Sequence, residues 1–301
     1  MIDRNFILKA YHYLMNRIRF FNVSNKNVLD TLNKVHYYKK YKRKYRKFLK
    51  VKDYNLENKK SSYDKVWIFW YQGIENAPDL VKSTINSIKF TMKNKEVIIL
   101  TKDNLNKYVS LPDYIEKRFQ KGQITMAHYS DLLRIELLTT IGGLWVDSTI
   151  LMTKKPFFVD SDIPLFAFKD VSLYRKEELP IAASNWLIYS NGKSNILHLT
   201  KELLYEYWKT HNHVSVYLVF HIFFKLATEV YKDEWKNVPT YSNVPPHILQ
   251  FELLDKYDEI RFNQIKEMSD IHKLNHRLAT EDKESNYYYI LNTWSENNEK
   301  N

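Results

Sequence analysis

Two short apolar runs on either side of a segment with helical spacing constrain the fold more than any other feature of this chain. The runs are VWIFW at Val66–Trp70 and VIIL at Val97–Leu100, and both have the β-branched or aromatic residues of buried strands. Leu80–Met92 between them has helical spacing, with Asp79 at the expected N-cap position. This order of strand, helix and strand is a βαβ unit, so the sequence predicts an α/β domain with a parallel sheet.

The residues after the first strand are candidates for ligand binding. In parallel sheets, ligands bind beyond the carboxyl ends of the strands. Trp70, Gln72 and Gly73 follow the first strand, so we expect them at this edge. Trp67 and Trp70 could equally be core residues; because strand residues alternate between faces, we expect one of the two to be core.

Composition excludes several classes of protein. The 301 residues include no cysteine, which excludes disulfide scaffolds, thiolate zinc sites and thiol nucleophiles. Only 5 glycines argue against a dinucleotide fold built on several glycine-rich phosphate turns. No apolar run reaches the length of a membrane-spanning helix, about 18 residues or more, so none is predicted.

Positive charge is concentrated at the N-terminus. Residues 1–60 hold 17 Lys and Arg against 4 Asp and Glu, while the whole chain has 46 against 35, so residues 61–301 carry 29 against 31. We therefore predict a basic amphipathic helical segment that associates with a membrane (residues 1–60), a catalytic domain (61–290) and a flexible tail (291–301).

The basic segment has the composition of a membrane-surface anchor. The first 22 residues have apolar side chains at helical spacing, and Lys39–Lys52 holds nine cations and no acid. Its aromatic residues are Tyr41, Tyr45 and Phe48. Each cation near an anionic leaflet adds about 1 kcal/mol. We expect residues 1–52 to bind an anionic membrane surface; a solvated linker and an RNA-binding arm are the alternatives.

A charged pair interrupts the most apolar helical segment. Ala127–Ile141 is predicted to be a helix that is apolar on most sides and therefore buried, yet it carries Asp131 and Arg134 on one face. Burying these charges is costly unless they are paired or used. They form either a structural ion pair or a site where Asp131 accepts from sugar hydroxyls and Arg134 supports the sugar or a diphosphate.

An acidic residue follows the next strand. Gly142 and Gly143 are expected to end the helix, LWV begins a strand, and Asp147 falls at the carboxyl end of that strand. It would face the same sheet edge as Trp70. A carboxylate there is a candidate contact to a metal ion or to ribose.

These residues carry a resemblance to a known family. SDLLRIELLTTIGGLWVDST at Ser130–Thr149 resembles the pattern SDxxRxxxLxxxGGxWxDxT of the capsular polysaccharide synthesis glycosyltransferases, within the sugar-binding-region family that contains a DXD motif. VWIFWYQGIENAPDLV is similar to the family's WxxWxQGxxxxP segment. Weaker similarities lie at Ser184–Leu197, Val216–Phe224 and Ile271–Leu274.

The resemblance implies a GT-A-like, Rossmann-type fold with a mostly parallel sheet flanked by helices, and a retaining transferase with a UDP-sugar donor. It implies transfer of a hexose, galactose or glucose, to a lipid-linked saccharide during bacterial capsular repeat-unit synthesis, at the cytoplasmic face of the plasma membrane. The nucleotide-sugar contacts would be Trp70, Gln72, Gly73, Asp131, Arg134, Asn185 and Lys273. The catalytic residues would be Asp131, Arg134 and Asp147.

The motif departs from DXD at its second acid, where this chain has Thr149. The resemblance implies Mn²⁺ or Mg²⁺ held by Asp147, Thr149 and His272, but a hydroxyl replaces a carboxylate poorly, so we expect low metal affinity or further ligands. His272 could instead be an ordinary surface or core histidine. Lys273 is a candidate cation for the departing diphosphate.

Some alternatives stay open. His221 is either a core histidine or a sugar or phosphate contact, and Trp186 either stacks on a sugar or belongs to the core. No side chain stands out as a nucleophile, so the acceptor could attack on the face that the diphosphate leaves. Other candidate functions are a nucleic-acid-binding protein that uses the basic arm, although no nucleic acid is expected for the transferase, and a glycosyltransferase that acts on protein.

Overall fold

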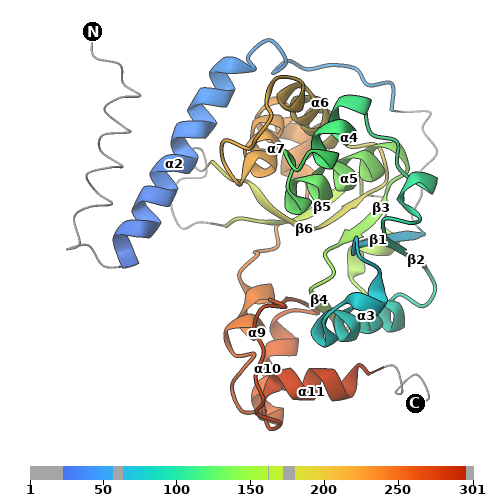
Figure 1. Ribbon diagram of the computed structural model, residues 1–301. Helices are drawn as coiled ribbons and strands as arrows, with labels where there is room; N and C mark the ends of the chain where they lie inside the picture. Colours follow the sequence, from blue (N-terminus) through green and yellow to red (C-terminus); the bar gives the residue numbers. More distant parts are fainter. Residues whose placement is uncertain (1–22, 57–63, 162, 172–179, 296–301) are drawn as a thin grey trace.

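The computed structural model describes residues 23–56, 64–161, 163–171 and 180–295. The predicted amphipathic helix within residues 1–22 and most of the predicted tail lie outside these ranges. The described chain is a mixed α/β structure, with helices on both faces of a central five-stranded sheet (Figure 1).

The central sheet has the strand order β2-β1-β3-β6-β5. The strands are β1 (Lys65–Phe69), β2 (Glu96–Leu100), β3 (Gly143–Val146), β5 (Leu165–Lys169) and β6 (Ala183–Ser190). β1 pairs in parallel with β2 and β3, whereas β6 runs antiparallel to β3 and β5. Four strands therefore run in one direction and β6 in the other, so the predicted βαβ unit and mostly parallel sheet are confirmed.

Strand β1 shows why both faces of the sheet are covered. Trp67 and Phe69 belong to one apolar cluster, while Val66 and Ile68 belong to another, and all four are buried. The indole of Trp67 donates to the carbonyl of Gly142 at 2.9 Å, which fixes it in the core. Trp67 is the core residue of the two tryptophans, at 0% exposure, whereas Trp70 follows the end of the strand and is only partly buried.

The helices follow from amphipathic segments. One face of the sheet carries α4 (Asp113–Gln120), α5 (Met126–Thr140), α6 (Asn195–Thr210) and α7 (Val219–Val230), and the other carries α3 (Asp79–Thr91). The N-cap of α3 is Pro78 and Asp79 is its first helical residue, which corrects our N-cap assignment by one position.

A C-terminal section packs below the sheet in Figure 1. It contains α9 (Ile248–Phe251), α10 (Glu259–Met268) and α11 (Asn286–Thr293), while α8 (Lys232–Asn237) precedes it. Its strand β7 (Ile271–Lys273) pairs antiparallel with β4 (Ile150–Met152), which directly follows the strand-end segment after β3. This two-stranded ribbon brings the C-terminal section to the predicted site.

Helix α2 (Val23–Lys44) lies beside α7 (Figure 1). Tyr41 is 1% exposed, with its ring centroid 5.3 Å from that of Phe223, and Tyr45 is 3% exposed and 5.1 Å from the same ring. These two tyrosines are part of the core and are not available as aromatic contacts to a membrane, while membrane binding by residues 1–52 stays a prediction. The same burial removes them from any base-stacking surface of an RNA-binding arm.

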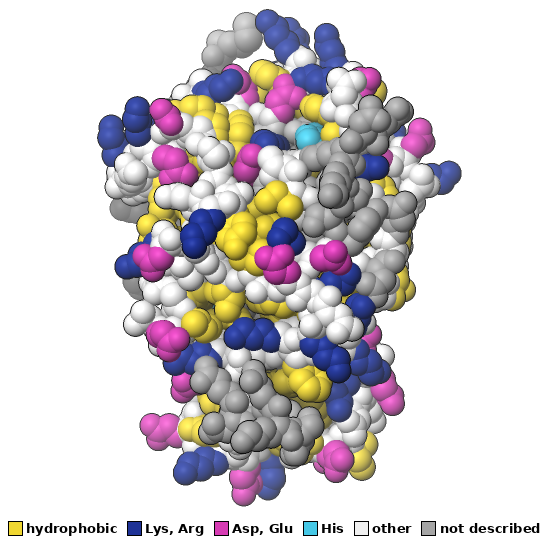
Figure 2. All heavy atoms as spheres, turned by 90° about the vertical axis from the view of Figure 1, so that its right-hand side faces the viewer, with side chains coloured by type: hydrophobic (Ala, Val, Ile, Leu, Met, Phe, Trp, Pro, Cys, Tyr) yellow, Lys and Arg dark blue, Asp and Glu magenta, His cyan; other side chains and the backbone are white. Residues whose placement is uncertain are grey.

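Charge on the described surface is mixed rather than gathered in one groove on the face that Figure 2 shows, where lysine and arginine side chains alternate with acidic ones. The cations of α2 and of the turn after it still reach solvent, including Lys39, Lys40, Arg43, Arg46 and Lys47. None of the helices in the described ranges combines the length and apolar content needed to cross a bilayer.

Candidate active site

A cavity of about 580 Å³ opens at the carboxyl ends of β1 and β3. This volume lies within the range of about 300–1,000 Å³ that is usual for ligand pockets. Its walls include the predicted residues Trp70, Gln72, Asp131, Arg134, Asp147, Thr149, Asn185 and Lys273. Gly73 and His272, which we also predicted, do not line it. The structure therefore brings the predicted residues to one shared cavity, except for Gly73 and His272.

Local structure places the two charged residues of α5 on the cavity. Thr125 caps the helix by accepting from the backbone N–H of His128, and the helix ends before Gly142 and Gly143, whose φ angles are +89° and +104°. A Cβ on Gly143 would lie 2.5 Å from the backbone oxygen of Lys65, so only glycine fits where β3 passes β1. This tight passage starts the strand that ends at Asp147.

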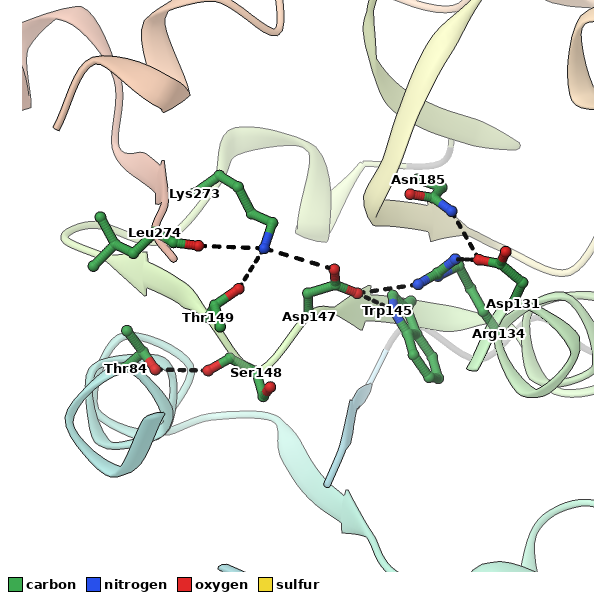
Figure 3. Close-up of polar contacts among 10 residues, drawn as sticks. All are labelled: Thr84, Asp131, Arg134, Trp145, Asp147, Ser148, Thr149, Asn185, Lys273 and Leu274. Carbon is green, nitrogen blue, oxygen red and sulfur yellow. Dashed lines mark hydrogen bonds and ion pairs between the residues drawn. The ribbon is translucent and has the colours of Figure 1, made fainter. Parts of the chain in front are cut away.

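Arg134 holds two carboxylates at once (Figure 3). One terminal nitrogen donates to Asp131, and the other donates to Oδ1 of Asp147 at 3.0 Å. The rings of Trp145 and Phe220 flank the guanidinium, with centroids 4.8 and 5.6 Å from its carbon. The side chain is only 3% exposed. The structural ion pair is therefore confirmed, and Arg134 also lines the cavity.

Asp131 is the most buried acid of the group. It accepts from Nδ2 of Asn185 at 2.8 Å in addition to Arg134, so residues of α5 and β6 hold it from two sides. Burial raises the pKa of Asp131 above its ordinary value, while the neighbouring charge of Arg134 opposes this by favouring the carboxylate.

Asp147 stands where β3 ends. Its Oδ1 accepts from the indole of Trp145 at 3.0 Å as well as from Arg134, and its Oδ2 lies 3.9 Å from Nζ of Lys273. The next residue is anchored to α3, because Thr84 donates to the backbone oxygen of Ser148 at 2.6 Å (Figure 3). The strand end is thus fixed from both sides, and the carboxylate is 28% exposed toward the cavity.

Lys273 reaches the same place from the C-terminal section. Its Nζ donates to the hydroxyl of Thr149 and lies 3.4 Å from the backbone oxygen of Leu274. Burial lowers the pKa of the Lys273 ammonium, and the negative charge of Asp147 opposes this. The ribbon of β4 and β7 fixes this position, since Ile150 pairs with Lys273 in its ladder.

His272 does not share this cavity. It is paired across the ribbon with Leu151, a member of the C-terminal apolar cluster, and is fully buried. Neighbouring residues of a strand face opposite sides, so Lys273 enters the cavity and His272 enters the core. Burial lowers the pKa of His272 to about 4, so the ring is neutral at pH 7. The predicted metal ligand His272 is therefore corrected to a core residue.

Two other candidates are structural. Gly73 precedes a single 3₁₀ turn at Ile74–Asn76 with φ +87°, which shapes the loop after β1 without lining the cavity. Trp186 is 6% exposed and stacks on Phe168, with ring centroids 4.9 Å apart. The core alternative for Trp186 is confirmed.

The cavity also has walls that the sequence reading did not include. They are His128, Tyr217, His276 and Arg277, together with His221, for which we had left two alternatives open. His128 could have been found, because it precedes Asp131 by three residues on the same helix. His221 lies in the cavity wall with a buried Nδ1 that forms no hydrogen bond with a described residue, and burial lowers the pKa of the ring to about 3.

The residues at the strand end do not fit a divalent ion held by the protein. Among the described residues, no group of three or more His, Asp and Glu side chains gathers as metal ligands. Oδ1 of Asp147 already accepts two hydrogen bonds, and the hydroxyl of Thr149 accepts from the ammonium of Lys273. Mg²⁺ prefers a near-octahedral shell of oxygen atoms, whereas this position holds one carboxylate and a cation.

Comparison with known proteins gives partial matches. The chain is 27% identical over 96 residues to a protein named glycosyltransferase afumC of Aspergillus fumigatus, and 29% identical over 97 residues to O-glycosyltransferase braB of Annulohypoxylon truncatum. Each match covers 29% of this chain, and the chain spans about a quarter of the length of these curated relatives, 25% and 23%.

A solved structure and a family model cover more of the chain. The structure titled PaToxG Glycosyltransferase aligns with 88% of this chain and 96% of its own, at 12% identity and a TM-score of 0.39. The family model described as capsular polysaccharide synthesis protein matches residues 17–291, which include the whole cavity. The chain therefore belongs to the capsular polysaccharide synthesis protein family.

Proposed function

We propose that this protein is a retaining glycosyltransferase of GT-A type. It moves a hexose, galactose or glucose, from a UDP-sugar to a lipid-linked saccharide in the synthesis of a bacterial capsular repeat unit. One observation carries the proposal: Asp131, Arg134, Asp147 and Lys273 form a connected polar group in one cavity at the carboxyl ends of the strands. Membership in a capsular polysaccharide synthesis family supports it, as do the names of the two curated relatives.

The charge of the cavity suits a diphosphate. Its walls carry three basic side chains, Arg134, Lys273 and Arg277, and two acids, Asp131 and Asp147, which leaves 3 − 2 = +1 when all five are charged and the histidines are neutral. Cationic groups in a fixed position stabilise the negative charge that develops on a leaving diphosphate. Lys273 and the exposed Arg277 would contact the phosphates, while Asp147 would accept from a ribose hydroxyl.

The remaining walls divide between base and sugar. Trp70 and Gln72 follow β1 and would lie by the uracil. Asp131 and Asn185 would hold hydroxyls of the transferred sugar, since each has further hydrogen-bonding capacity beyond the contact they share.

The reaction follows from the state of the two carboxylates. Oδ1 of each carboxylate accepts a charge-assisted hydrogen bond from Arg134, which lowers the nucleophilicity of both acids toward the anomeric carbon. The acceptor hydroxyl therefore attacks on the face that the diphosphate leaves. The new bond joins the acceptor oxygen to the anomeric carbon, the sugar–phosphate bond breaks, and the acceptor proton passes to a diphosphate oxygen. Trapping a covalent glycosyl-enzyme would overturn this step.

Membrane attachment is the part of the proposal that rests on charge alone. The exposed cations of α2 and the following turn would face an anionic leaflet at the cytoplasmic side, together with residues 1–22. Flotation with anionic and neutral vesicles tests this. Equal binding to both would refute an electrostatic anchor, and loss of anionic binding in Lys39→Glu/Lys40→Glu would support it.

Donor binding is tested by calorimetry with UDP-galactose, UDP-glucose, UDP-N-acetylglucosamine and GDP-mannose. We expect a UDP-hexose to bind, and Asp147→Asn to weaken it. Asp233→Asn, an exposed acid outside the cavity, is the matched control and should bind as the wild type does. Product analysis on lipid-linked saccharides and on proteins separates the proposed acceptor from a protein acceptor. If no nucleotide sugar binds to the folded protein, the proposed function is wrong.

A further inference from the structure

We propose that the ammonium of Lys273 occupies the place that a divalent cation holds in DXD glycosyltransferases, so that this transferase works without a metal ion. The inference rests on the proposed function and names the catalytic group at its leaving diphosphate. It is drawn from the side chains that surround the strand end, not from whether an ion is bound there.

The ammonium of Lys273 lies at the end of β3, beside the motif residues. Nζ of Lys273 bonds the hydroxyl of Thr149 and lies 3.9 Å from Oδ2 of Asp147 (Figure 3). These are two of the three side chains that the resemblance assigns to the metal; the third, His272, lies in the core. A cation is therefore already present between the first acid of the motif and the residue that replaces its second acid.

The charge of Lys273 opposes the binding of a second cation between Asp147 and Thr149. A divalent ion bound to Asp147 and Thr149 would come within about 4 Å of the ammonium. Charges of +2 and +1 at this distance repel each other strongly in a partly buried site. The two oxygens of Asp147 that would bind such an ion are already engaged, Oδ1 by Arg134 and Oδ2 by the Lys273 ammonium at 3.9 Å. The site therefore disfavours a divalent ion as long as Lys273 is charged.

The pairing of β4 with β7 holds the Lys273 ammonium in place. Thr149 and Lys273 belong to neighbouring backbones: Leu274 donates its N–H to the carbonyl of Thr149 at 2.9 Å, directly beside the paired residues Ile150 and Lys273. The cation is thus positioned by the ribbon ladder, and its side chain is still 21% exposed toward the cavity. A group fixed before the substrate binds stabilises the developing charge without reorganisation.

The test compares transfer from the preferred UDP-hexose in EDTA and in Mn²⁺ or Mg²⁺, after the protein has been stripped of metal. The wild type should have the same kcat within about twofold in all three. Lys273→Met should lose roughly 10²–10³-fold in kcat, as removal of one transition-state donor does elsewhere, and Lys273→Arg should recover part of it. Lys154→Met, which removes an exposed lysine beyond the far end of β4, is the matched control and should be unaffected.

A second variant tests the replacement directly. Thr149→Asp/Lys273→Gln restores two acids and removes the ammonium, so it should bind Mn²⁺ in the presence of UDP, measured by electron paramagnetic resonance, and its activity should become Mn²⁺-dependent. The wild type should show no such binding. This readout does not depend on turnover.

The outcomes are separable. Transfer that occurs only with a divalent ion, or full kcat in Lys273→Met, overturns the inference and leaves the proposed function in place. Mn²⁺ binding to the wild type at the strength of the double variant also overturns it. Absence of both nucleotide-sugar binding and transfer, with and without metal, overturns the proposed function and the inference with it.

Discussion

Loss of Arg134 should destabilise the fold strongly, because its guanidinium holds two carboxylates. Arg134→Met leaves Asp131 buried at 8% exposure and Asp147 partly buried, both without their shared cation. Breaking a buried ion pair from one side costs about 3–5 kcal/mol, because the remaining charge is uncompensated. Asp131→Asn should cost less, about 1–2 kcal/mol, since Arg134 keeps Asp147 and the new amide oxygen can still accept from Asn185.

A double-mutant cycle measures this coupling. Asp131→Asn/Arg134→Met should be more stable than the sum of the single effects predicts, by about 1–3 kcal/mol, because the two partners are removed together. The free energy of unfolding is measured by urea denaturation at pH 7 with circular dichroism. Arg261→Met is the matched control: its ion pair with Glu252 at 2.5 Å lies at the surface, with the Arg261 side chain 41% exposed, so its loss should cost far less than that of Arg134. If Arg134→Met costs no more than Arg261→Met, or if the cycle is additive, the buried network has been misjudged.

Three further predictions concern other parts of the chain. Gly143→Ala should destabilise the protein more than Gly73→Ala. Both positions have positive φ, where an alanine costs about 1–3 kcal/mol of strain, but of the two only at Gly143 would the Cβ meet a backbone oxygen. Equal shifts in melting temperature would contradict this. Tyr41→Ala should cost about 3–5 kcal/mol of stability, as loss of a buried aromatic side chain does, whereas unchanged urea denaturation would show that α2 is not docked. The pKa of about 4 for buried His272 lies below the 6.5 of an unfolded histidine, so the unfolded state binds more protons between these values. Stability should therefore fall by about 3 kcal/mol as the pH drops from 6.5 to 4, and His272→Leu should lack that part of the loss in pH-dependent denaturation.

The parts of the fold that sequence predicts well are those written in local patterns. The two strands of the βαβ unit, helix α5 and the start of β3 at its glycine pair all lie within a residue or two of their expected bounds. Each depends on spacing within a few neighbouring residues, and the end of β3 then places Asp147 at the sheet edge. The cavity follows from these elements, so most of its predicted walls were found.

The parts that sequence predicts poorly depend on distant pairing. β4 and β7 are three residues each, and the residues that they pair are far apart in the sequence, such as Ile150 with Lys273. Periodicity in so short a strand cannot tell which residue faces the cavity, and a slip of one residue would exchange His272 and Lys273. Likewise, tyrosines among lysines suit a membrane surface and a helix packed on α7 equally well, because composition does not reveal what covers an aromatic face.

Helix α2 has a mechanical consequence. Its 22 residues span about 33 Å at 1.5 Å per residue. Its C-terminal half packs on α7 through Tyr38 and Tyr41 and through the ion pair of Lys42 with Glu229. It is a stiff spacer rather than a slack tether. An attachment point ahead of Val23 would therefore fix both the distance and the orientation of the catalytic domain relative to that point.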